Sequence, residues 1–144
     1  MRGIWSIVLS LLLVLPMGEA WAEIAGINSA INKAGRQRML SQRMAKYYLA
    51  QTWGIGDAAS AAEIDRARQE FEEAQRELDM AVINTPRIKG ELDVAKQQWI
   101  FFLSALDPRT IRDRRAAVVV ASSSERILEA MENVVGLYER VGGR

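Results

Sequence analysis

Residues 24–56 read IAGINSAINKAGRQRMLSQRMAKYYLAQTWGIG, and this stretch decides the fold of the chain. Its apolar side chains recur at spacings of three and four residues, as in Ile24, Ile27 and Ile31. Such spacing places them on one face of an α-helix. Gly54 and Gly56 then permit a turn. The pattern therefore predicts a long amphipathic helix that ends at these two glycines.

Three more amphipathic segments follow, each with a helix start signal. The second helix is expected to begin at a capping box of Ser60 and Glu63, whose side chains would satisfy free backbone amides reciprocally. Thr85–Pro86 and Asp107–Pro108 each combine an N-cap residue with a proline at the first helical position. They predict the starts of the third and fourth helices. Because such short connections favour antiparallel packing, we predict an all-α fold, an up-down-up-down four-helix bundle.

The N-terminus has the features of a secretory signal peptide. Arg2 precedes an almost unbroken apolar run from Ile4 to Leu15, and Ala20 and Ala22 are small residues suited to a cleavage site. We expect residues 1–22 to be a signal peptide, cleaved after Ala22, and residues 23–144 to form a periplasmic or secreted binding domain. The alternative is an uncleaved membrane anchor, although the run is shorter than the about 20 apolar residues of a spanning helix.

The composition argues against several classes of function. The chain has no cysteine and no histidine, which removes disulfides, thiol- or His-based nucleophiles, and His-ligated metal sites or covalently attached haem. A formal net charge of +1 provides no basic excess for nucleic-acid binding. We therefore expect no enzymatic activity, no cofactor, no metal site and no nucleic-acid partner.

The first helix carries a charge where its spacing calls for an apolar residue. Residues 24–56 include five basic residues and no acidic one, and Arg38 lies seven residues from both Ile31 and Ala45, on nearly the same face. A buried guanidinium requires a partner. Either acidic residues of the second helix neutralise it, or small neighbours such as Gly35 leave space for a planar anion, held by bidentate hydrogen bonds.

The run from Ile31 to Met44, INKAGRQRMLSQRM, resembles the signature at the start of the PilJ-type sensor domain. This domain is the N-terminal, periplasmic module of type IV pilus methyl-accepting chemotaxis transducers and is related to the sensor domain of nitrate/nitrite histidine kinases. The resemblance implies a four-helix bundle that often dimerises through its first helices. It also implies that the arginine before a methionine, here Arg38 before Met39, binds an anion at the dimer interface.

The resemblance and the spacing together define candidate residues on the first helix. The predicted ligand-binding residues are Arg38, Gly35, Met39, Gln42 and Ala34. The predicted dimer interface contains Ile24, Ile31, Asn32 and Ala45. The expected partners are a small anionic or polar ligand, a second copy of the chain and a membrane receptor of chemotaxis, type IV pilus or nitrate-type signalling. The residues after Met39 are closer to the pilus branch, so the identity of the ligand does not carry over.

A second interpretation is a structural or protein-interaction bundle without a small-molecule ligand. In that case Tyr47, Tyr48 and Trp53 would be interface anchors, since aromatic side chains often dominate protein interfaces. Packing of at least one of these tyrosines in the core is the competing explanation.

Overall fold

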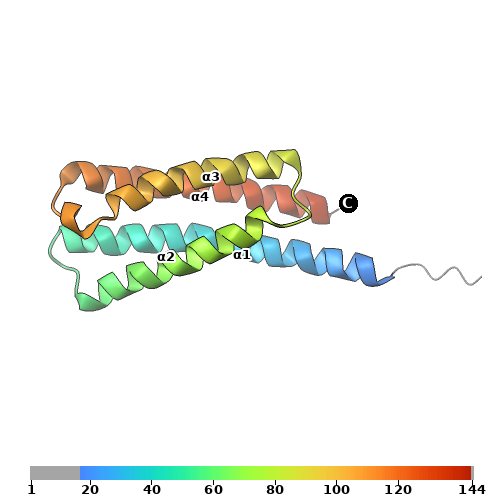
Figure 1. The fold of residues 1–144 in the computed structure, drawn as a ribbon, viewed down its shortest axis with the longest axis horizontal. Coiled ribbons are helices and arrows are strands. Elements are labelled where there is room, and N and C mark those ends of the chain that lie inside the picture. The colour runs from blue at the N-terminus through green and yellow to red at the C-terminus, as the bar shows by residue number, and fades with distance from the viewer. Residues whose placement is uncertain (1–16, 144) are drawn as a thin grey trace, which may run out of the picture.

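The computed structural model describes residues 17–143 and contains four α-helices and one 3₁₀ turn (Figure 1). Their bounds are α1 Met17–Thr52, α2 Ala58–Asp79, α3 Pro86–Ala105, η1 Pro108–Thr110 and α4 Arg114–Gly142. The helices run alternately in opposite directions, and no strand occurs among the described residues. The predicted all-α four-helix bundle is confirmed.

The helices are not packed equally. α1 lies along both α2 and α4, and α4 also packs along α3, whereas α2 and α3 make few contacts with each other. Figure 1 shows the α1–α2 turn and the η1 segment at one end of the bundle and the α2–α3 turn at the other. α2 and α3 diverge toward the end at which α2 begins. This arrangement makes α1 and α4 the central pair.

The core lies between the four helices and includes a short stack of aromatic rings. Phe71 of α2 stacks on Trp99 of α3 with 4.1 Å between ring centroids, and Trp99 also stacks on Phe102 at 5.6 Å. Phe71 and Phe102 are fully buried. Burial of such side chains contributes about 1.5–3 kcal/mol each, so this stack is the main link between α2 and α3.

The start of α2 differs from the prediction, because Asp57 and not Ser60 is the N-cap residue. The Asp57 carboxylate accepts hydrogen bonds from the Ser60 hydroxyl and backbone N–H, both at 2.9 Å, and these bonds lower the pKa of Asp57 below its usual value. The Ser60 hydroxyl accepts the Asp57 N–H at 3.3 Å. The capping box therefore forms three residues earlier, from Asp57 and Ser60, because a carboxylate is a stronger acceptor than a hydroxyl.

The predicted start of the third helix is confirmed and that of the fourth is wrong. The Thr85 hydroxyl caps α3 by accepting the Ile88 N–H at 3.2 Å. The Asp107–Pro108 pair instead begins η1. Asp113 caps α4, where its carboxylate accepts the Arg115 N–H at 2.8 Å.

Thr110 explains why the chain does not continue from η1 into a longer helix. Its hydroxyl donates to the Asp107 carbonyl at 2.7 Å. Its own carbonyl accepts the Asp113 N–H at 2.7 Å and the Tyr48 hydroxyl at 3.0 Å. A carbonyl held in this way closes a turn against α1, and α4 has to start anew after it.

Most of the predicted signal peptide, residues 1–22, lies outside the described residues, and residues 17–22 belong to the first turns of α1. Along residues 17–143, no helix combines the length and the apolar content that crossing a membrane requires. Cleavage after Ala22 and the domain boundary at residue 23 stay predictions.

Candidate functional site

Helix α1 has one fully buried face. The face that the sequence predicted to be buried, with Ile31, Arg38 and Ala45, lies to one side of it. Side chains at three- and four-residue spacing fill the core: Ile27, Ala30, Ala34, Gln37, Ser41, Met44 and Tyr48. Arg38 follows this face by one residue, and its side chain is 36% exposed. Ile31 is half-buried and Asn32 is exposed, while the side chain of Ile24 lies outside the described set. Arg38 therefore lies at the edge of the bundle and not inside it.

Arg38 has an acidic partner within the chain, contrary to the expectation of an unpaired guanidinium. Its Nη1 donates to Oε1 of Glu132 at 3.1 Å. The partner comes from α4 and not from α2, because α4 packs along this flank of α1. The Glu132 side chain is 57% exposed, so the pair contributes little to stability.

Gly35 leaves room for the guanidinium of Arg38. A Cβ added at Gly35 would have Nη2 of Arg38 as its nearest contact, at 3.9 Å. The side chain of Arg38 therefore lies back over the preceding turn of α1, as helical side chains usually do. Among residues 26–143, the only ion pair of Arg38 is the one from Nη1 to Glu132.

The other candidate residues divide between core and surface. Ala34 is fully buried and packs inside the bundle, and its contact with a ligand stays a prediction. Ala45 is 5% exposed and packs at the α1–α4 boundary. Met39 is 48% exposed and points away from the core. Gly35 and Met39 are thus the candidates that share a surface with Arg38.

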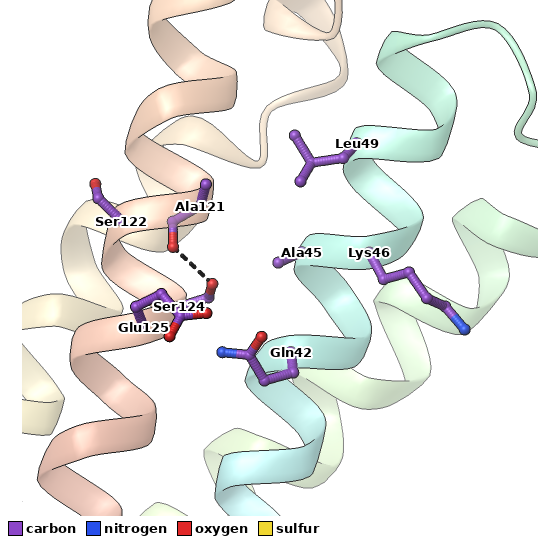
Figure 2. A pocket seen from close by; sticks show the side chains of 8 residues that line it. All are labelled: Gln42, Ala45, Lys46, Leu49, Ala121, Ser122, Ser124 and Glu125. Carbon is purple, nitrogen blue, oxygen red and sulfur yellow. Dashed lines mark hydrogen bonds between the residues drawn. The ribbon is translucent and has the colours of Figure 1, made fainter.

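Gln42 lies in a groove between α1 and α4 (Figure 2). Its side chain reaches from α1 toward Glu125 of α4, whereas Lys46 points away from the groove. The Nε2 atom of Gln42 is buried and has no hydrogen-bond partner among the described residues. Small residues line the rest of the groove, including Ala45 and Ala121. Gln42 therefore lies one turn after Arg38, on the same side of α1 that faces α4, with its amide nitrogen buried in the groove.

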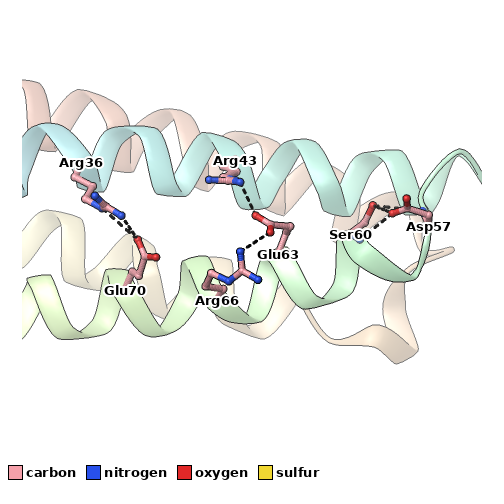
Figure 3. Close-up of polar contacts among 7 residues, drawn as sticks. All are labelled: Arg36, Arg43, Asp57, Ser60, Glu63, Arg66 and Glu70. Atoms are coloured by element: carbon pink, nitrogen blue, oxygen red, sulfur yellow. Dashed lines mark hydrogen bonds and ion pairs between the residues drawn. The ribbon is translucent and has the colours of Figure 1, made fainter.

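Three of the other four basic residues of α1 pair with acidic residues of α2, as Figure 3 shows for Arg36 and Arg43. Arg36 binds Glu70 through Nη2 at 2.7 Å and Nε at 3.2 Å, and Lys33 lies 3.0 Å from Glu77. Arg43 binds Glu63, which also accepts from Arg66 at 2.7 Å. The interpretation that α2 neutralises α1 is correct for these three residues. Arg38 turns toward α4 instead, and Lys46 lies over the ring of Tyr47.

The three aromatic candidates, Tyr47, Tyr48 and Trp53, differ in how deeply they are buried. Tyr48 is 1% exposed and its hydroxyl is bound to Thr110, so it is a core residue. Tyr47 lies beneath Lys46, with 4.8 Å from Nζ to the ring centroid. Trp53 is 81% exposed at the α1–α2 turn. Across the part of the chain that the structure describes, no group of three or more acidic side chains is placed to hold a metal ion.

Sequence reasoning missed Gln37, which places an amide in the core. It is 0% exposed, and its Nε2 donates to the Phe71 carbonyl at 3.3 Å and to Oε1 of Gln75 at 3.2 Å. Its Oε1 has no partner among the described residues. Its spacing in the sequence indicates a buried position, because Gln37 lies seven residues after Ala30 and seven before Met44.

Comparison with known proteins identifies the family. The model of the PilJ family, described as the type IV pili methyl-accepting chemotaxis transducer N-terminal domain, matches residues 21–134. The chain belongs to this family. It is also 30% identical over 115 residues to the methyl-accepting chemotaxis protein McpN of Pseudomonas aeruginosa PAO1. That match covers 74% of this chain but 21% of the relative, so the chain spans about a fifth of the length of McpN. No solved structure matches the chain.

The match to the PilJ family covers most of the four-helix bundle. The match spans α1, α2, α3 and most of α4. It therefore extends well beyond the run from Ile31 to Met44 that carries the resemblance in the sequence. Arg38 and its partner Glu132 both lie inside the matched range, so the contact between them joins two helices of the PilJ domain.

Proposed function

We propose that this PilJ domain is an exported, non-catalytic sensor module that binds a small anion at Arg38 and passes the signal to a membrane receptor. The guanidinium of Arg38 carries the proposal. It lies at the surface over Gly35, and a single exposed carboxylate contacts one of its nitrogens. An incoming planar anion can engage the other N–H groups, or displace Glu132, at small cost.

A second copy of the chain completes the proposed site. The outward face of α1 carries Asn28, Asn32, Gly35 and Met39, spaced by four, three and four residues, and the first two are exposed. This spacing is that of a coiled-coil seam, and the small or flexible side chains allow two helices to approach closely. Two copies that meet here bring two Arg38 side chains together.

The pairing of two arginines supplies the sensing mechanism. Like charges a few ångströms apart repel each other, and this repulsion disfavours the dimer without ligand. An anion between the two guanidinium groups reverses the sign of the interaction. The ligand then shifts the helices through its higher affinity for the close arrangement.

Thermal denaturation with small anions tests this proposal. Nitrate or nitrite, compared with chloride at equal ionic strength, should raise the Tm of the wild-type protein by several degrees. Arg38→Gln should remove the effect. Arg36→Gln is the matched control, because it loses the same charge two residues away, on the side of α1 that faces α2. Equal stabilisation of the Arg38→Gln variant, or no stabilisation of the wild type by either anion, contradicts the proposal.

The alternative function, a protein-interaction bundle, is favoured by the α1–α2 turn. Trp53 and Ile55 are 81% and 80% exposed on either side of Gly54, whose φ of 73° is in the left-handed region. An exposed tryptophan beside an exposed isoleucine is typical of a protein contact. A stoichiometric partner that is retained by Arg38→Ala and lost by Trp53→Ala would support this function over anion sensing.

A further inference from the structure

A pocket opens at the end of the bundle where α2 diverges from α3. Its volume is about 240 Å³, and it lies between α1, the first turns of α2 and the η1 segment. Apolar side chains from these different elements form its walls: Tyr48, Ile64, Leu106, Pro108 and Ile111. Ile64, Leu106 and Ile111 also pack against the hydrophobic core. The pocket is therefore an apolar recess that continues into the core.

Local structure holds the recess open. Tyr48 is fixed by the hydrogen bond from its hydroxyl to the Thr110 carbonyl at 3.0 Å, which ties η1 to α1. Gln51 is held at the wall by the α1–α2 turn, because a Cβ at Gly56 would lie 2.6 Å from Cγ of Gln51. The closeness of these atoms requires glycine at position 56. The walls therefore exist before any ligand arrives, which lowers the cost of binding.

Two opposite charges lie at the rim of this recess. Asp65 and Arg68 both line it, one helical turn apart on α2. Their closest atoms are 3.9 Å apart, and their side chains are 67% and 46% exposed. At that distance the two charges attract each other only weakly. Each retains its capacity to bind a charged group that enters the pocket.

We propose that this pocket binds a free aliphatic α-amino acid. The carboxylate of the ligand pairs with the guanidinium of Arg68 and its ammonium pairs with the carboxylate of Asp65. Residues three apart on a helix are neighbours, so the two charged groups on one α-carbon can reach both side chains. The aliphatic side chain enters the recess, and its volume suits an amino acid better than a larger metabolite.

This site is independent of the proposed anion site. Arg38 contacts Glu132 on the flank of α1 that faces α4, whereas the pocket lies on the side that faces α2 and η1. All the groups that line the pocket come from one copy of the chain. Amino-acid binding therefore requires no dimer.

Isothermal titration of the protein with L-leucine, L-isoleucine and L-valine tests the inference. We expect saturable binding of one molecule per chain to at least one of them. 4-Methylpentanoate lacks the ammonium and 3-methylbutylamine lacks the carboxylate, so each should bind about tenfold or more weakly than leucine. Arg68→Gln and Asp65→Asn should weaken leucine binding by similar factors. Arg76→Gln, an exposed charge elsewhere on α2, is the matched control and should bind as the wild type does.

A substitution that fills the recess tests its location. Ala61 lines the pocket and is exposed, so Ala61→Phe should block binding while the Tm stays close to that of the wild type. Arg38→Gln should leave leucine binding unchanged, which separates this site from the anion site. Absence of binding at millimolar amino acid overturns the inference, as does leucine binding that neither Arg68→Gln nor Ala61→Phe weakens.

Discussion

Gln37 places a half-satisfied amide at the centre of the contact between α1 and α2. Its Nε2 donates to Phe71 and Gln75, while its Oε1 has no partner within the described residues. An unpaired buried acceptor costs about 1–3 kcal/mol. Near this position the α1–α2 contact is therefore weaker than an apolar layer would be.

Gln37→Glu tests how completely water is excluded from this position. The substitution keeps the shape but buries a carboxyl group, and burial raises its pKa because the charged form loses its solvation. A protein that buries a carboxyl group with a raised pKa becomes less stable as the pH rises above the pKa of that group in the unfolded chain, about 4.3. Near pH 4 the neutral carboxyl can donate one of the two hydrogen bonds that Gln37 donates, and between pH 4 and pH 8 the variant should lose about 3 kcal/mol of stability.

Denaturant titrations at the two pH values measure this difference. Gln97→Glu, on the exposed face of α3, is the control and should show little dependence on pH. A Gln37→Glu protein that is as stable at pH 8 as at pH 4 would mean that water reaches the side chain.

Arg38 shows how far the sequence can predict a site residue. Its spacing from Ile31 and Ala45 predicted a position on the buried face of α1, whereas the structure places it beside that face, with its side chain 36% exposed. Its partner could not be predicted, because Glu132 is 94 residues away and the packing of α4 on α1 brings the two together. Helical periodicity describes one helix at a time, whereas an ion pair between helices depends on their relative rotation.

At the scale of elements, the sequence predicted the number and order of the helices but not every boundary. The helix start predicted from Thr85–Pro86 was correct, because the N-cap residue and the proline both act within the first turn of the helix. Two signals competed at α2, and the Asp57 carboxylate prevailed over the predicted Ser60. The Asp107–Pro108 signal produced only η1, because Tyr48 of α1 binds Thr110 and the chain turns there. Tertiary contacts of this kind are not visible in local patterns.

The observed cap of α2 can be tested by substitution. Asp57→Ala removes the acceptor of both Ser60 hydrogen bonds, and should lower the Tm by a few degrees at pH 7. The pKa of Asp57 is lowered in the folded protein, so its contribution is present at pH values above its unfolded pKa and is lost as the pH falls through the folded pKa. The difference in Tm between the two proteins should therefore vanish in strong acid. Ala59→Ser, a change at the next but one position, is a control that should leave the Tm nearly unchanged.

At the scale of the whole molecule, both ends of the bundle are closed by tyrosine hydroxyls. Tyr48 ties η1 to α1 at one end. At the other, Tyr138 of α4 donates to Oδ1 of Asn84 in the α2–α3 turn at 2.6 Å. Each bond joins a central helix to a connection between two others. The α3–α4 connection is therefore anchored to α1 at one end, and the α2–α3 turn to α4 at the other.

Ionisation of Tyr138 should make the bundle less stable at alkaline pH. Burial, and secondarily the charge of Asp79, raise the pKa of Tyr138 to about 12. Because the folded pKa exceeds the unfolded value of about 10, the contribution of the phenol is complete below pH 10 and is lost as the pH rises toward 12. The wild type should lose about 2 kcal/mol across this range through this residue. Tyr138→Phe should be about 1 kcal/mol less stable at pH 7 and should lack this loss, since it has no phenol to ionise. Denaturant unfolding of both proteins between pH 7 and 12 measures the two slopes, and parallel curves would show that Tyr138 does not control the alkaline transition.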